Sequence, residues 1–222
     1  MNERLTHQEL LRKAKETSII PVFSHDTTEV AFKVIKACYY GGIRVFEFTY
    51  RSQNALKVFQ ELQPSLKELP GLSLGIGTIM DIHQCRQFYN AGASFIVSPI
   101  VDKEVAMFCQ ERQISWTPGC GTLTEIITAE RLGAQLIKVF PADVLGPKFI
   151  RSVLGPCSHL NLMPTGGVTP SEENLKAWFD AGVACVGMGS KLLSHSEIRE
   201  SNYEGLTRKV ARLLSVINQI KL

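Results

Sequence analysis

The sequence lacks the features that would point to a metal centre, a disulfide framework or a membrane span. No two of its six cysteines form a CxxC pair, and its five histidines show neither HxH nor HExxH spacing, so no metal-ligand set is visible. The cysteines lie mostly within apolar segments, where free thiols act as small core residues, and this predicts a reducing, cytoplasmic compartment. The absence of any run of about 18 apolar residues excludes a membrane-spanning helix.

A strong charge of one sign is also missing. The net charge of +3 comes from 24 basic and 21 acidic residues scattered along the chain. No basic run is long enough for a nucleic-acid-binding tail, so we expect small-molecule partners, with at most a bias toward anions. Residues 1–16 are too charged for a secretory segment, and their apolar residues predict a short amphipathic helix.

What is present is an alternation of short apolar runs and longer amphipathic stretches along 222 residues. The eight runs, expected as strands, are 18–23, 44–50, 72–78, 94–100, 115–120, 135–141, 161–166 and 184–192. The helix candidates between them include 27–40, 53–67, 81–91 and 172–181. Strictly alternating strands and helices indicate parallel strands with crossover helices. We therefore predict an α/β fold, a (β/α)8 TIM barrel forming one domain over 1–222, with the N-terminal helix 1–16 capping the barrel.

Four of the expected strands share a glycine that ends the preceding helix. The repeats are GIRVFE from Gly42, GASFIV from Gly92, GAQLIK from Gly133 and GVACVG from Gly182. These belong to the second, fourth, sixth and eighth strands, and alternate strands of a barrel contribute to one interior layer. The fifth position after each glycine is Glu47, Val97, Lys138 and Gly187. If the repeat preserves strand phase, Glu47 and Lys138 point inward together, beside the open space left by a glycine.

Two opposite charges inside a barrel are costly unless they pair or take part in chemistry. Glu47 and Lys138 form a structural ion pair in one interpretation, and in another a slip in phase turns one of them toward the helices. Their position near the C-terminal ends of their strands, where barrels carry their active sites, favours chemistry. Burial disfavours a charged lysine, and a neutral amine attacks ketones to form a Schiff base. Glu47 is then the candidate for moving protons.

Other polar residues follow the same strand ends. The guanidinium of Arg51 is suited to hold a substrate carboxylate through two parallel hydrogen bonds, and the hydroxyls of Thr78 and Thr165 are suited to orient a carboxylate or ketone oxygen. A solvated arginine at the top of a helix and a threonine in a strand-end turn are the ordinary alternatives. Phosphate recognition is suggested by two glycine-rich segments after the seventh and eighth strands, with a helix N-terminus behind them. Those segments contain Gly166, Gly167, Gly189 and Ser190. Lys191 either adds charge there or points to solvent.

The sequence resembles the bacterial 2-keto-3-deoxy-6-phosphogluconate (KDPG) / 4-hydroxy-2-oxoglutarate (KHG) aldolase family. The segments that carry the resemblance are GGIRVFEFTYRSQNAL, GIGTIMD, AGASFIVSPIVD, PGCGTLTEI with IKVFPAD, and MPTGGVTPSEENL. The resemblance implies that Lys138 is the Schiff-base lysine and Glu47 the general acid/base. It also implies a substrate pocket that includes Arg51, Thr78, Pro99 and Thr165, a phosphate loop at 166–167 and 189–190, a homotrimer, and no metal or organic cofactor. The chain departs from the family pattern at Ile76, at Cys120 and Gly121, and at Lys191, where an aromatic or apolar residue is common.

We expect a class I aldolase that cleaves KDPG to pyruvate and glyceraldehyde 3-phosphate. The nearest alternative is a sister aldolase acting on 4-hydroxy-2-oxoglutarate or on 2-keto-3-deoxy-6-phosphogalactonate, because the pyruvate half of the site would be the same. A non-catalytic phosphate-binding barrel, and a phosphosugar isomerase or synthase without a Schiff base, are further alternatives.

Overall fold

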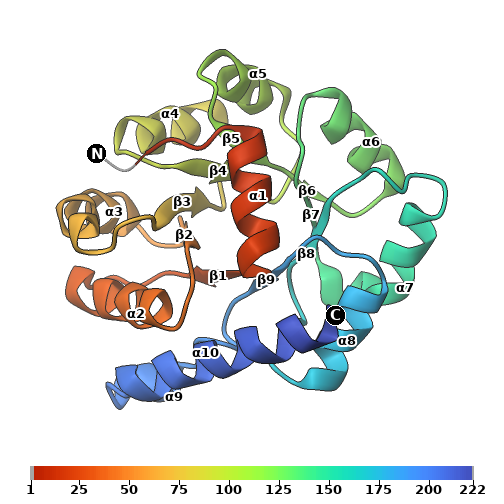
Figure 1. Cartoon of the computed structure of the whole chain (residues 1–222). Helices are drawn as coiled ribbons and strands as arrows, with labels where there is room; N and C mark the ends of the chain where they lie inside the picture. The colour runs from red at the N-terminus through yellow and green to blue at the C-terminus, as the bar shows by residue number, and fades with distance from the viewer. Residues whose placement is uncertain (1–2, 222) are drawn as a thin grey trace.

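The computed structural model describes residues 3–221, and it places short parallel strands at the centre of a ring of helices (Figure 1). The strands are β1 (Ile19–Phe23), β2 (Val45–Thr49), β3 (Ser73–Gly77), β4 (Phe95–Val97), β5 (Ser115–Thr117), β6 (Gly119–Cys120), β7 (Ile137–Val139), β8 (Leu162–Pro164) and β9 (Val186–Met188). The helices are α1 (His7–Thr17), α2 (Thr28–Tyr40), α3 (Ala55–Leu62), the 3-10 helix η1 (Gln63–Glu68), α4 (Ile82–Asn90), α5 (Lys103–Glu111), α6 (Leu123–Arg131), α7 (Ala142–Leu154), α8 (Glu172–Asp180), α9 (His195–Arg199) and α10 (Tyr203–Ile220). Within the described residues, no helix is long and apolar enough to cross a membrane.

The strands form two parallel sheets, in the orders β5-β4-β3-β2-β1-β9 and β6-β7-β8. A single bridge between Thr165 and Gly187 connects the end of β8 to β9, and β5 runs into β6 through Pro118. A curled parallel sheet with helices between its strands is an α/β barrel-like fold.

Each of the eight apolar runs contains a strand, as predicted. The run 115–120 is divided into β5 and β6 because Pro118 has no N–H to donate to a neighbouring strand. The carbonyl of Pro118 still accepts a hydrogen bond from the Lys138 N–H at 2.9 Å, which keeps the chain beside β7. The predicted helix 53–67 is observed as α3 followed by η1.

Buried residues along the strands separate into two clusters, one inside the curled sheet and one between the sheet and the helices. Val45 belongs to the inner cluster, while Phe46 and Phe48 belong to the outer one. Because side chains alternate along a strand, Glu47 points to the same side as Val45. The inner cluster contains Leu5, Leu10, Ala14, Ile20, Val45, Phe95, Val97, Leu136, Met163 and Cys185.

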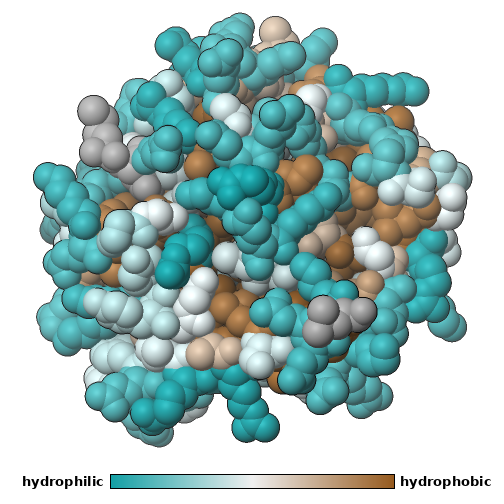
Figure 2. All heavy atoms as spheres, viewed as in Figure 1, coloured by the Kyte–Doolittle hydropathy of each residue, from teal (hydrophilic) through white to brown (hydrophobic). Residues whose placement is uncertain are grey.

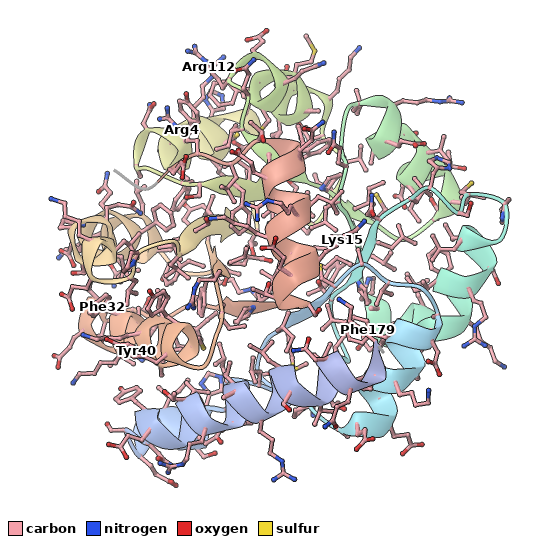
Figure 3. All side chains as sticks on the ribbon, viewed as in Figure 1. Arg4, Lys15, Phe32, Tyr40, Arg112 and Phe179 are labelled. Carbon is pink, nitrogen blue, oxygen red and sulfur yellow. The ribbon has the colours of Figure 1, made fainter. Side chains whose placement is uncertain are left out.

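Helix α1 crosses in front of the strands in Figure 1 and contributes Leu10 and Ala14 to the inner cluster. Leu5 bridges two strands through its backbone: its N–H donates to Ser94 and its carbonyl accepts from the Ser115 N–H. Hydrophilic residues cover much of this face, with hydrophobic residues visible in the gaps beside α1 (Figure 2). One of the hydrophilic residues on this face is Lys15, which lies near the C-terminal end of α1 (Figure 3). The N-terminal segment therefore packs on the N-terminal ends of the strands, opposite the strand ends where the predicted site residues lie.

Candidate active site

The two charged residues predicted to share an interior layer are in contact. The Lys138 Nζ atom of β7 donates to Glu47 Oε1 of β2 at 3.5 Å, and both side chains are almost fully buried. The glycine repeat therefore predicted the phase of both strands correctly, and the slipped alternative is wrong. Breaking a buried ion pair by removing one partner leaves an uncompensated charge, so each residue constrains the other.

Two glycines leave the space that this layer needs. A side chain at Gly77 would overlap the Glu47 carboxylate, whose carbon would lie 2.6 Å from the added Cβ atom. A side chain at Gly187 would overlap the hydroxyl of Thr165. The first contact explains why the segment GIGT ends β3 with a glycine, a role that the sequence alone did not reveal.

Three buried oxygens in the barrel interior have no hydrogen-bond partner within the described chain: Glu47 Oε2, Thr117 Oγ1 and Thr165 Oγ1. Buried polar atoms are nearly always paired in folded proteins, so these three oxygens are available to accept hydrogen bonds from a bound molecule or water. Thr165 was predicted as a substrate-binding residue, but Thr117, on β5 and only 1% exposed, was not. Its signal in the sequence is weak, because threonine is common in strands.

A cavity of about 250 Å³ opens beside this layer, at the C-terminal ends of the strands. Six of the predicted residues line it: Arg51, Thr165, Gly166, Gly167, Gly189 and Ser190. Phe140, which also lines the cavity, connects it to the buried lysine, because the Lys138 Nζ atom lies 5.6 Å from the centre of its ring. Lys138 and Glu47 do not themselves line the cavity, and Phe140 is the lining residue that lies next to the lysine.

Thr78 and Pro99, both predicted to bind substrate, do not line this cavity. They follow β3 and β4, whereas the cavity is formed by the segments after β1, β2, β7, β8 and β9. Thr78 has a left-handed backbone, with φ of 67°, directly after Gly77. The carbonyl of Pro99 packs against Gly119, which is the strand partner of Lys138. The assignment of both residues to the substrate stays a prediction.

The segment after β9 differs from the expected helix N-terminus. The N–H groups of Leu192 and Leu193 both donate to the Gly189 carbonyl, so residues 189–193 form a tight turn. Helix α9 begins only at His195 and has five residues. Backbone donors of a turn, not those of a helix end, are therefore what this segment offers to an anion.

A lysine amine and a carboxylate held together beside a cavity can form an imine with a ketone and move its protons, so the site has the parts of an imine-forming enzyme. The family described as KDPG and KHG aldolase matches residues 10–209. The chain therefore belongs to this aldolase family, and it is a carbon–carbon lyase.

Individual relatives agree with this assignment. The KHG/KDPG aldolase of Escherichia coli (strain K12) is 31% identical over 196 residues, which cover 87% of this chain and 89% of that protein. The 2-dehydro-3-deoxy-6-phosphogalactonate aldolase of the same strain is 38% identical over 120 residues, which cover 54% of this chain and 58% of that protein. The crystal structure of a KDPG aldolase from Legionella pneumophila, with pyruvate captured as a covalent carbinolamine, has a TM-score of 0.82 and 27% identity, covering 91% of this chain and 97% of that one.

Proposed function

We propose that the protein is a class I aldolase that cleaves KDPG to pyruvate and glyceraldehyde 3-phosphate. The observation that carries the proposal is the buried contact of 3.5 Å between Lys138 Nζ and Glu47 Oε1 beside an open cavity. A lysine and a carboxylate with this burial and spacing are the two groups that imine chemistry requires.

In the proposed reaction, the neutral Lys138 amine attacks the C2 ketone, and the resulting carbinolamine loses water to give a protonated imine. Glu47 transfers the protons of this dehydration and then takes the proton from the C4 hydroxyl. The C3–C4 bond breaks, its electron pair moves into the imine to give an enamine, and the aldehyde leaves. Protonation of C3 and hydrolysis of the imine release pyruvate and regenerate Lys138.

The remaining residues divide between the two halves of the substrate in this proposal. The Arg51 guanidinium binds the keto-acid carboxylate, and the unpartnered Thr165 hydroxyl orients the same end. The backbone at Gly166–Gly167 and Gly189–Ser190 binds the phosphate. Thr78 and Pro99 stay predicted contacts of the keto-acid end, although neither lines the cavity.

We also propose the finer architecture expected from the sequence. The Thr165–Gly187 bridge and the β5–β6 connection support a fully closed (β/α)8 barrel forming one domain over 1–222, with α1 covering its N-terminal end. A homotrimer is supported by large apolar side chains exposed on neighbouring segments, which would be buried by a second copy. These are Met80, Ile100, Met107 and Leu123.

The experiment that tests the function is reductive trapping. Borohydride added in the presence of pyruvate should give a stable adduct on Lys138, located by peptide mass spectrometry, and Lys138→Ala should abolish retro-aldol cleavage while the protein stays folded. Lys148→Ala is the matched control, because Lys148 is exposed and does not line the cavity. An adduct on Lys148 or Lys191 in the wild type would refute the assignment.

A second candidate substrate is the galactonate epimer. The observation that favours it is the 38% identity over 120 residues to an aldolase named for 2-dehydro-3-deoxy-6-phosphogalactonate. Both epimers give the same two products, so the pyruvate and phosphate ends of the site serve either of them. Comparing kcat/KM for the two epimers on the wild-type enzyme decides between them.

A further inference from the structure

The segment after β9 brings to the cavity two residues that the proposed mechanism does not use, one on the turn and one at the start of α9. Lys191 and His195 both line it, on the side of the glycine-rich segments, and Arg51 lines it from the end of β2. Among the described residues that line this cavity, none is an aspartate or a glutamate. The cavity therefore has positively ionisable side chains with no carboxylate facing them, which is the electrostatic condition for binding an anion.

The carboxylate close to Lys191 in the chain is already engaged. Glu197 is bonded to Lys209 of α10 at 2.9 Å, and it also accepts the hydroxyl of Ser194. Burial raises the pKa of Glu197, but the hydrogen bonds from Ser194 and Lys209 outweigh burial and lower the pKa below its ordinary value. Glu197 is thus committed as an anion to Lys209, and no ion pair joins Lys191 to any carboxylate within residues 3–221.

The backbone that carries Lys191 is fixed. Leu192 and Leu193 are buried in the outer cluster, and the Lys209 Nζ atom donates to the Leu192 carbonyl at 2.8 Å. The Lys191 side chain itself is exposed. A cation on an anchored turn binds a ligand without first ordering the loop, so its position beside the cavity is pre-organised.

One carboxylate lies behind the other glycine-rich segment. A Cβ atom at Gly166 would be 3.2 Å from Asp143 Oδ1, although Asp143 does not itself line the cavity. Its negative charge opposes an anion bound at Gly166–Gly167. Lys191 also lines the cavity, and its ammonium group supplies a positive charge that counters this effect.

We propose that Lys191 and His195 form a cationic wall that binds the distal anionic group of the substrate and sets the preference for a phosphate dianion over a carboxylate. This inference rests on the proposed function, because it assigns the aldehyde half of the substrate to this end of the cavity. A compact ammonium group gains more from a dianion than from a single negative charge, and backbone N–H groups alone make a smaller distinction between the two.

The test compares KDPG with unphosphorylated 4-hydroxy-2-oxoglutarate on wild type, Lys191→Gln, Lys191→Arg and His195→Gln, with Lys148→Gln as the control at an exposed lysine outside the cavity. Loss of one charge-assisted hydrogen bond predicts a rise in KM for KDPG of about tenfold in Lys191→Gln, with kcat changed less. Cleavage of 4-hydroxy-2-oxoglutarate should respond much more weakly, and Lys191→Arg should recover most of the KM. His195→Gln should shift KM in the same direction.

The affinity for glycerol 3-phosphate, measured by calorimetry, tests phosphate binding without any reaction. Lys191→Gln should weaken this binding by a similar factor. An equal loss on both substrates, or the same loss in Lys148→Gln, would overturn the inference. So would unaltered binding of glycerol 3-phosphate by Lys191→Gln. The trapped pyruvate adduct on Lys138 distinguishes failure of the proposed function from failure of this inference. If the wild type gives no adduct, the proposed function is wrong. If the adduct forms but Lys191→Gln affects both substrates equally, only the role of Lys191 and His195 is wrong.

Discussion

The Glu47 carboxylate has two oxygens in different situations: Oε1 accepts from Lys138, and Oε2 has no partner among the described residues. A carboxylate with one oxygen free can hold the lysine in place and still reach a proton on the substrate. The carboxylate can take this position only because Gly77 has no side chain to occupy the same space.

Glu47→Gln preserves the shape of the side chain and removes its capacity to take a proton. We expect the rate of cleavage to fall by roughly 10²–10⁴-fold, the usual contribution of general acid–base catalysis. Formation of the pyruvate adduct on Lys138, followed separately, should slow but remain detectable. Turnover close to that of the wild type would reduce Glu47 to a structural partner of the lysine.

Gly77→Ala places a methyl group where the Glu47 carboxylate lies, so the carboxylate must move. A displacement of about 1 Å at a catalytic group costs on the order of 10²-fold in rate, and we expect kcat to fall by that order. Gly155→Ala is the matched control, because a Cβ atom there meets only ordinary contacts at 3.6 Å or more. Circular dichroism and thermal melting show whether each variant is folded. A folded Gly77→Ala enzyme with normal kcat would contradict this account of the glycine.

At the residue scale, the sequence predicted the buried charged pair better than the groups that surround it. Lys138 and Glu47 were found because a charge inside an apolar strand is unusual. Thr117 and Phe140 are residue types that strands and strand ends contain routinely, so nothing distinguished them before the structure showed an unpaired hydroxyl and a ring near the lysine. Thr78 was assigned to the substrate as a strand-end hydroxyl and by resemblance, and Pro99 by resemblance alone; neither lines the cavity, and both assignments stay predictions.

At the scale of elements, the strands were predicted well because parallel strands buried on both faces are nearly continuous apolar runs. The phase of β2 and β7 followed from the glycine that ends the preceding helix, since it fixes where each strand begins. The segment after β9 was predicted less well. A GxGS sequence is compatible with both a helix N-terminus and a tight turn. The turn is favoured because Leu192 and Leu193 are buried, and their burial depends on contacts with residues distant in the chain.

At the scale of the whole molecule, most thiols lie inside the packed structure. Burial, with a smaller contribution from Glu125, raises the pKa of Cys120 to about 12, and burial raises the pKa of Cys185 to about 12 as well. Burial also raises the pKa of Cys38. At pH 8 these groups are neutral thiols, which react slowly. Cys157 is the one that is partly exposed among the cysteines.

We therefore expect iodoacetamide at pH 8 to label Cys157 first in the native protein, and the remaining cysteines only as the protein unfolds. Cys157→Ser should remove the fast phase, and denaturant should expose all six thiols. Because the folded-state pKa values of Cys120 and Cys185 lie above the unfolded value near 9, the folded state should also lose stability as pH rises above about 9. Rapid native labelling of Cys120 would show that the region beside the site opens far more readily than its burial indicates.

The packing of both chain ends against the starts of the strands has a practical consequence. Leu5 is bonded between Ser94 and Ser115, and the Lys221 Nζ atom donates to the Lys15 carbonyl and to the Ser18 hydroxyl just before β1. The cavity lined by Arg51 and Thr165 opens at the other end of the same strands. A carrier protein, an affinity tag or a solid support attached through either end would therefore lie on the face opposite the cavity and leave the cavity opening exposed to solution.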